Sequence, residues 1–207
     1  MHITLEKTGK KYHREWVFRG LDASFEPNRA YGIVGANGSG KSTLLQLIAG
    51  HIMPTEGSVA YALNGSPVPP EQVYRQVAVA APYLELFEEL TLQELLITHS
   101  RFKPYREQLT AKQVLAQLGL ERVADRPVKQ FSSGMKQRVK LGLAVLSDTQ
   151  LLLLDEPVVN LDAAGVAWFH ALLDRHREGR LLVTCSNHQE AELAFCDAQL
   201  DVETFKP

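Results

Sequence analysis

The segment at residues 35–42 constrains this chain more than any other. It reads Gly-Ala-Asn-Gly-Ser-Gly-Lys-Ser, which is the pattern G-x-x-x-x-G-K-[ST]. The glycines let the backbone curl so that successive N–H groups point inward and cradle phosphate oxygens. Lys41 supplies a mobile positive charge for the β- and γ-phosphates, and Ser42 supplies a hydroxyl oxygen for Mg²⁺. The segment therefore predicts a site for nucleotide phosphates.

The residues on either side of this loop fit that prediction. An apolar run at Ala30–Val34 predicts a buried strand, and residues 43–49 form an apolar helical pattern that Gly50 closes. Since a helix N-terminus adds partial positive charge at the phosphates, the chemistry needs this order of strand, loop and helix. We expect the nucleotide to be held by Gly35, Asn37, Gly38, Ser39, Gly40, Lys41, Ser42 and Thr43.

Composition excludes several classes of partner. The 207 residues carry a net charge of −2, which offers no electrostatic basis for binding nucleic acid or an anionic membrane directly. Cys185 and Cys196 form neither a disulfide framework nor a metal site, and their apolar neighbours indicate buried free thiols in a reducing compartment. No stretch approaches the roughly 20 apolar residues that cross a bilayer, and Met1–Lys7 lacks a signal-peptide core. We expect a cytoplasmic protein that serves a membrane only through a partner.

The pattern along the chain changes twice. Alternating apolar and polar residues in the first 30 positions predict half-buried antiparallel strands. Capping boxes at Thr91 and Thr110 then open two predicted helices, and the α/β pattern returns at about residue 148. We therefore expect one domain over residues 1–207. Its α/β core, with an antiparallel β subdomain, covers 1–82 and 148–207, and a helical subdomain covers 83–147.

A second part of the nucleotide site follows a strand that is apolar on both faces. Residues 150–154 read Gln-Leu-Leu-Leu-Leu and lead into Asp155 and Glu156, the Walker B pattern. Open α/β sheets bind ligands at the carboxyl ends of their strands, where Asp155 emerges. There Asp155 can hold Mg²⁺, and Glu156 can act as the general base for an attacking water.

Residues 131–135 read Phe-Ser-Ser-Gly-Met and precede Lys136-Gln-Arg138. Taken alone, they predict an ordinary helix N-cap. In spacing and place they resemble the signature motif of ABC-type ATPases, whose usual form is Leu-Ser-Gly-Gly-Gln. The resemblance implies a P-loop NTPase fold with a RecA-like core. It also implies that Ser132, Ser133 and Gly134 cover the γ-phosphate bound to a second subunit.

Other elements of that family occur in the same order. Tyr12, 29 residues before Lys41, stands where the family has an aromatic that stacks on adenine, although nearby Trp16 is a rival. Val17 stands where an aliphatic side chain packs on the ribose. Leu161-Asp162 matches the D-loop, and we include Asp162 among the nucleotide-binding residues.

His188 matches the family's switch histidine, which contacts the γ-phosphate and the attacking water. The alternative is a surface histidine, because Asn187 beside it offers local hydrogen bonds. The resemblance implies catalytic roles for Glu156, His188 and Lys41, with ATP as the nucleotide and Mg²⁺ held by Ser42 and Asp155.

Three positions depart from the family pattern. Pro82 stands where the family places the Q-loop glutamine, and a proline offers neither an amide side chain nor a backbone N–H. Glu85 could substitute, but its spacing does not support this. Ser133 and Met135 replace a glycine and a glutamine of the signature. Because Glu156 and His188 are present, we expect slow but real ATP hydrolysis.

The resemblance implies the ATP-binding and ATP-hydrolysing subunit of an ABC transporter. Such a chain forms a head-to-tail homodimer around two ATP molecules and drives a separate membrane permease from the inner face of the cytoplasmic membrane. Two other readings stay open, namely a soluble ABC-type ATPase in complex assembly or repair and a nucleotide-dependent regulatory module that does not hydrolyse. Cargo contacts belong to the permease, so the sequence identifies neither the cargo nor the direction of transport.

Overall fold

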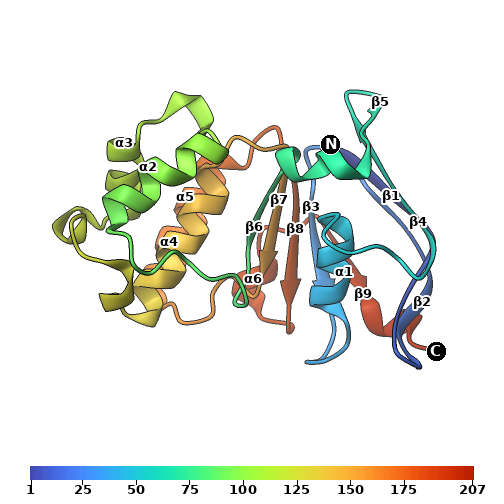
Figure 1. Cartoon of the computed structure of the whole chain (residues 1–207). Helices are drawn as coiled ribbons and strands as arrows, with labels where there is room; N and C mark the ends of the chain where they lie inside the picture. The colour runs from blue at the N-terminus through green and yellow to red at the C-terminus, as the bar shows by residue number, and fades with distance from the viewer. The chain divides into compact units, whose positions relative to one another are not determined.

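The apolar runs around the phosphate loop form a five-stranded sheet in the order β6-β7-β8-β3-β9 (Figure 1). Its strands are β3 (Ala30–Val34), β6 (Val77–Ala80), β7 (Leu151–Asp155), β8 (Leu181–Ser186) and β9 (Ala198–Asp201). The four strands β7, β8, β3 and β9 run parallel. Every residue of β3, β7 and β8 is buried, and helices α1 (Lys41–Ile48) and α6 (Glu190–Leu193) pack on β8. These strands therefore fix the loops that leave their carboxyl ends.

The alternating pattern of the N-terminal residues forms a separate antiparallel sheet, as predicted. Its order is β2-β1-β4-β5. The strands are β1 (His2–Tyr12), β2 (Glu15–Phe25), β4 (Glu56–Leu63) and β5 (Ser66–Pro67). Apolar side chains on one face of this sheet join those of β3, β7 and β8 in one hydrophobic cluster. This shared core sets the position of β1 and β2 relative to the phosphate loop.

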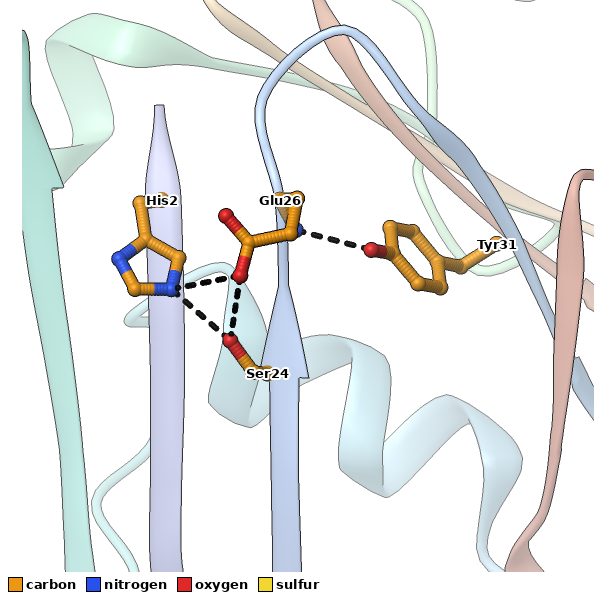
Figure 2. A network of polar contacts seen from close by, with 4 residues as sticks. All are labelled: His2, Ser24, Glu26 and Tyr31. Atoms are coloured by element: carbon orange, nitrogen blue, oxygen red, sulfur yellow. Dashed lines mark hydrogen bonds and ion pairs between the residues drawn. The ribbon is translucent and has the colours of Figure 1, made fainter.

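A polar network also ties the first two strands to β3 (Figure 2). The Nε2 atom of His2 lies 2.8 Å from the hydroxyl of Ser24 and 3.4 Å from a carboxylate oxygen of Glu26. The Ser24 hydroxyl donates to the Glu26 carboxylate at 3.0 Å. The backbone N–H of Glu26 donates to the hydroxyl of Tyr31, also at 3.0 Å. Since Tyr31 belongs to β3, the network fixes the turn that enters the phosphate-binding strand.

Four α-helices lie in a region outside the two sheets. They are α2 (Leu92–Phe102), α3 (Ala111–Leu118), α4 (Ser133–Leu146) and α5 (Ala163–His176). Both predicted capping boxes are confirmed, because the Thr91 and Thr110 hydroxyls accept from the backbone N–H groups three residues later. Short 3₁₀ helices are η1 (Pro70–Gln76), η2 (Arg106–Gln108), η3 (Glu121–Val123), η4 (Val128–Gln130) and η5 (Val202–Phe205).

The computed structural model describes residues 1–207, which group into two units. The sheet unit comprises Met1–Val79, Gln150–Glu156 and Gly179–Pro207, and the helical unit comprises Ala80–Thr149 and Pro157–Glu178. The helical unit thus includes α5, whereas the sequence pattern places α5 in the core. α5 packs on α4, where the guanidinium of Arg138 lies 4.6 Å from the ring centroid of Trp168. The exact subdomain boundaries stay a prediction.

No helix has both the length and the apolar character needed to span a membrane.

The side chain of His99 on α2 makes stability depend on pH. Its Nε2 atom lies 2.9 Å from the Ser147 hydroxyl, and its ring stacks on Tyr105 with centroids 5.6 Å apart. Burial, with a smaller contribution from Lys103, lowers the pKa of His99 to about 4. The unfolded chain binds this proton near pH 6.5, so the stabilisation is complete above that pH and is lost as pH falls toward 4.

We therefore expect replacement of His99 by Gln to flatten part of the pH dependence of stability. Urea unfolding at pH 7 and pH 4.5 measures it, and the wild type should lose about 2 kcal/mol more than His99→Gln between these values. His13→Gln, at an exposed histidine, serves as the matched control and should behave as the wild type. An identical loss in His99→Gln and in the wild type would contradict the assignment.

Candidate active site

Register between parallel strands places the segments that contain Lys41, Glu156 and His188 at one edge of the sheet. The last residues of β3 and β8 are paired, and Asp155 at the end of β7 pairs with Cys185, the penultimate residue of β8. The chain therefore leaves β3 into the phosphate loop, β7 into Glu156 and β8 toward His188 from the same edge. This is where open α/β sheets bind their ligands.

Lys41 lies beneath the phosphate loop rather than in solvent. It is 5% exposed, and its ammonium donates to the carbonyl oxygens of Gly35 at 2.8 Å and Ala36 at 3.0 Å. These bonds close the loop on its own lysine. A phosphate that enters the loop offers the ammonium stronger, charged acceptors than two carbonyl groups.

The loop leaves donors for an anion. Gly40 precedes α1 with φ of 109°, and the helix has no side-chain cap, so the first-turn N–H groups lack a side-chain partner. The Ser39 hydroxyl is buried and has no hydrogen-bond partner. Asn37 and Gly38 are exposed, and Thr43 is half-buried. Unused backbone donors and an orphaned hydroxyl suit the phosphates of ATP.

Gly35 is the position where the loop depends most on glycine. Its φ is +148°, and a Cβ there would lie 2.6 Å from the Ser39 hydroxyl oxygen. At Gly40 a Cβ would lie 2.5 Å from a methyl group of Val17. Val17, predicted to pack on the ribose, thus abuts the phosphate loop.

Asp155 and Ser42 provide oxygen donors beside the loop. Asp155 is 3% exposed and accepts a hydrogen bond from the Ser42 hydroxyl. Burial raises the pKa of Asp155, whereas the hydrogen bond from Ser42 and the charge of Lys41 act in the opposite direction. No group of three or more His, Cys, Asp or Glu side chains forms a metal cluster. The pair nevertheless fits Mg²⁺, which binds at phosphate sites through one or two carboxylates together with phosphate oxygens.

The two cysteines differ in their surroundings. Both are free thiols, with Cys185 buried and Cys196 half-buried. Burial and the nearby Asp155 carboxylate raise the pKa of the Cys185 thiol. The prediction of a buried free thiol in apolar surroundings is confirmed for Cys185, which belongs to the main hydrophobic cluster although β8 also places it beside Asp155.

Glu156 and His188 share an uncommon backbone conformation. Their φ values are 46° and 57°, in the left-handed region that few non-glycine residues adopt. The N–H of Glu156 donates to the carbonyl of Cys185 at 3.1 Å, which fixes the turn after β7. Glu156 is half-buried and His188 is exposed. Such conformations cluster at active sites, where the surrounding structure maintains the strain.

Tyr12 and Val17 line one cavity of about 810 Å³ together with Gly38 of the phosphate loop. Tyr12 is 46% exposed, and the Lys10 ammonium lies 5.2 Å from the centroid of its ring. Trp16 also lines the cavity, but its ring already carries two cations. Arg19 lies 4.7 Å and Lys11 5.4 Å from its centroid. Tyr12 therefore keeps more open ring surface for a base.

The signature residues lie in the helical unit, where they begin α4. The Ser132 hydroxyl accepts from the N–H of Met135 at 3.2 Å, so the helix cap predicted there is present. Ser133 is exposed, and a Cβ on Gly134 would lie 3.0 Å from the carbonyl oxygen of Asn160. Asp162 caps α5 by accepting from Gly165 at 2.7 Å. The signature and the D-loop thus lie close together within this unit.

Pro82 is exposed, and its carbonyl accepts from the Lys140 ammonium at 3.1 Å. The Glu88 carboxylate lies 2.5 Å from the ammonium of Lys136, which belongs to α4 as Lys140 does. The Glu89 carboxylate lies 2.8 Å from the Lys129 ammonium. The basic residues around the signature are therefore tied to the segment that follows Pro82.

Comparison with known proteins decides the family. Residues 18–159 match the model of the ABC transporter family. The chain is 31% identical to the uncharacterized ABC transporter ATP-binding protein YybJ of Bacillus subtilis, covering 93% of this chain and 88% of that one. It is 32% identical to the zinc import ATP-binding protein ZnuC of Pseudomonas fluorescens, over 90% of this chain and 68% of that one. This chain belongs to the ABC transporter family.

The fold agrees with this membership. A bacterial ABC transporter cassette solved as a dimer superposes with a TM-score of 0.81 at 24% identity, over 97% of this chain and 95% of that one. The predicted ABC ATPase fold, with its antiparallel β subdomain, parallel core and helical insert, is confirmed. The chain is an ATP-binding subunit of the ABC transporter type and belongs to an ATPase family.

Sequence reasoning missed two residues of the cavity that Tyr12 lines. Lys206 and Pro207 also line it, although they lie at the other end of the chain. No local motif marks them, because only the packing of η5 against β2 brings them there.

We expect Gly35→Ala to weaken ATP binding, because a Cβ would displace Ser39 and strain a left-handed backbone. The dissociation constant, measured with a fluorescent ATP analogue, should rise about tenfold or more, which corresponds to about 1.4 kcal/mol. Gly20→Ala is the matched control, since Gly20 also has a positive φ but nothing lies within 4 Å of its Cβ position. Equal affinities of the two variants would refute the steric argument.

Proposed function

We propose that this chain binds ATP with Mg²⁺ at the edge formed by β3, β7 and β8, and drives a separate membrane permease as a head-to-tail homodimer. One observation carries the proposal. Lys41 and Ser42 follow β3, Asp155 ends β7 and Glu156 follows it, and these strands end within one residue of one another along the pairing with β8. The chain would act on the inner face of the cytoplasmic membrane, where its permease partner presents a docking surface.

Binding begins with an exchange of hydrogen bonds. The Lys41 ammonium leaves the carbonyls of Gly35 and Ala36 for the β- and γ-phosphate oxygens. The N–H groups at the start of α1 and the Ser39 hydroxyl donate to the same phosphates. Ser42 and Asp155 would hold Mg²⁺, and the bound ion would supply positive charge that offsets the phosphate oxygens. Tyr12 and Val17 contact the base and the ribose.

Hydrolysis then needs a base and a stabiliser. Glu156 accepts a proton from water while the water oxygen forms a bond to the γ-phosphorus. The bond between that phosphorus and the bridging oxygen breaks, and ADP leaves with the electron pair. His188 donates a hydrogen bond to the γ-phosphate, and Lys41 offsets the charge on the bridging oxygen. With a proline at 82 in place of a glutamine, we expect this step to be slow.

Dimer formation completes the site. Ser132, Ser133 and Gly134 open α4 and lie beside Asn160, in a unit separate from the phosphate loop. In the proposed dimer they donate to the γ-phosphate held by the other copy. ATP then favours the closed state because it contacts both subunits, and phosphate release removes that preference.

The first test is Glu156→Gln, which keeps the shape of the side chain and removes its basicity. Phosphate release should fall about 100-fold or more, since a positioned general base contributes that much. ATP binding should persist, and an ATP-dependent dimer should accumulate in size-exclusion chromatography. Glu121→Gln, on the exposed η3 helix, is the matched control and should hydrolyse ATP as the wild type does. Turnover that is unchanged in Glu156→Gln would exclude Glu156 as the base.

The second test concerns the permease. Affinity purification of the chain from its own membranes should recover an integral membrane protein, and addition of that protein in nanodiscs should raise ATP turnover. Exposed Tyr83, Phe87 and Phe102 in the helical unit are candidates for this contact. Recovery of soluble proteins alone would favour a role in assembly or repair.

A further inference from the structure

The cavity beside Tyr12 has a wall that the phosphate-loop chemistry does not explain. Besides Tyr12, Trp16, Val17 and Gly38, it is lined by His13, Glu15, Lys206 and Pro207. Tyr12, Trp16 and Val17 provide aromatic and aliphatic surface next to the phosphate loop. Glu15 and Lys206 add a negative and a positive charge. The cavity that Tyr12 lines therefore also presents polar side chains of both charges.

The C-terminal wall is anchored by the same packing that shapes the phosphate loop. Val202 in η5 is fully buried in the main hydrophobic cluster. One of its methyl groups lies 3.2 Å from the position that a Cβ on Gly35 would take. η5 also packs against β2, the strand that contains Val17. The backbone before Lys206 is thus fixed relative to the nucleotide site.

The Lys206 ammonium makes only a weak, exposed ion pair. It lies 3.5 Å from a carboxylate oxygen of Glu203, and both side chains are about two-fifths exposed, at 44% and 40%. Exposed pairs of this kind add little stability, and long side chains leave them readily. A ligand in the cavity that offers good acceptors can therefore recruit the ammonium.

Purine bases differ in what they offer to a lysine. Guanine presents two adjacent acceptors, N7 and O6, and lysine pairs with both. Adenine presents the N7 acceptor next to an N6 amino donor, which repels an ammonium group. We propose that Lys206 is a base-selecting residue of this nucleotide site and that it shifts the preference of the site from ATP toward GTP.

This inference rests on the proposed nucleotide site and adds to it the recognition of the base edge. Glu15 at the same cavity supports it, because a carboxylate accepts from the N1–H and N2 amino groups of guanine. Adenine offers one amino donor to that carboxylate and no acceptor that suits Lys206 as well. The two charged residues therefore act in the same direction.

The experiment measures the dissociation constants of ATP and GTP for the full chain by competition against a fluorescent nucleotide. The readout is the ratio of the ATP constant to the GTP constant. Lys206→Ala should lower this ratio about threefold to tenfold relative to the wild type, and Lys206→Glu should lower it further because a carboxylate accepts from adenine N6. Glu203→Gln frees the ammonium from its partner and should raise the ratio.

Lys112→Ala is the matched control, because it removes the same charge from α3, outside the cavity, and should leave the ratio unchanged. A ratio that Lys206→Ala and Lys206→Glu both leave at the wild-type value overturns the role of Lys206, while the proposed site stands. Failure of the wild type to bind either nucleotide overturns the proposed site and this inference together. Retention of both nucleotides with the predicted ratios supports both.

Discussion

The burial of Lys41 and Asp155 at the edge of one sheet is the constraint on which the rest of this structure depends. Removing an ammonium and a carboxylate from water costs several kcal/mol each unless other groups solvate them. Here two backbone carbonyls solvate the lysine, and the Ser42 hydroxyl helps to solvate the aspartate. Those groups lie at the right places only because β3, β7 and β8 are fully buried and in register. Polar groups of the protein itself therefore hold both charged groups beside the phosphate loop.

Short-range patterns carried most of what the sequence predicted correctly. The order of strand, loop and helix around residues 35–42 and the capping boxes at Thr91 and Thr110 all depend on groups within a few residues of one another. The buried strand that ends at Asp155 was also predicted correctly, because a strand covered on both faces needs an unbroken apolar run. In each case the interactions that form the element join residues that are close together in the sequence.

Contacts between residues far apart in the sequence could not be predicted from such local patterns. Lys206 reaches the cavity of Tyr12 only through η5, and no periodicity links positions so far apart. The hydrogen bond between Cys185 and Asp155 follows from the pairing of β7 with β8. The left-handed backbone conformation at Glu156 could not be predicted, because the residue that adopts it is not a glycine. The choice between Tyr12 and Trp16 likewise rests on which ring the cations of β1 and β2 cover.

Pro82 stands where the family has a glutamine, and other groups hold the segment that follows it. A proline contributes only its carbonyl, and here Lys140 of α4 takes that acceptor. Lys136 and Lys129 hold Glu88 and Glu89 farther along the same segment, so three contacts join it to α4 and to the residues just before it. Because α4 begins at the signature residues, these contacts connect the segment after Pro82 to the helix that carries the signature. The connection between this segment and α4 therefore does not depend on a side chain at position 82.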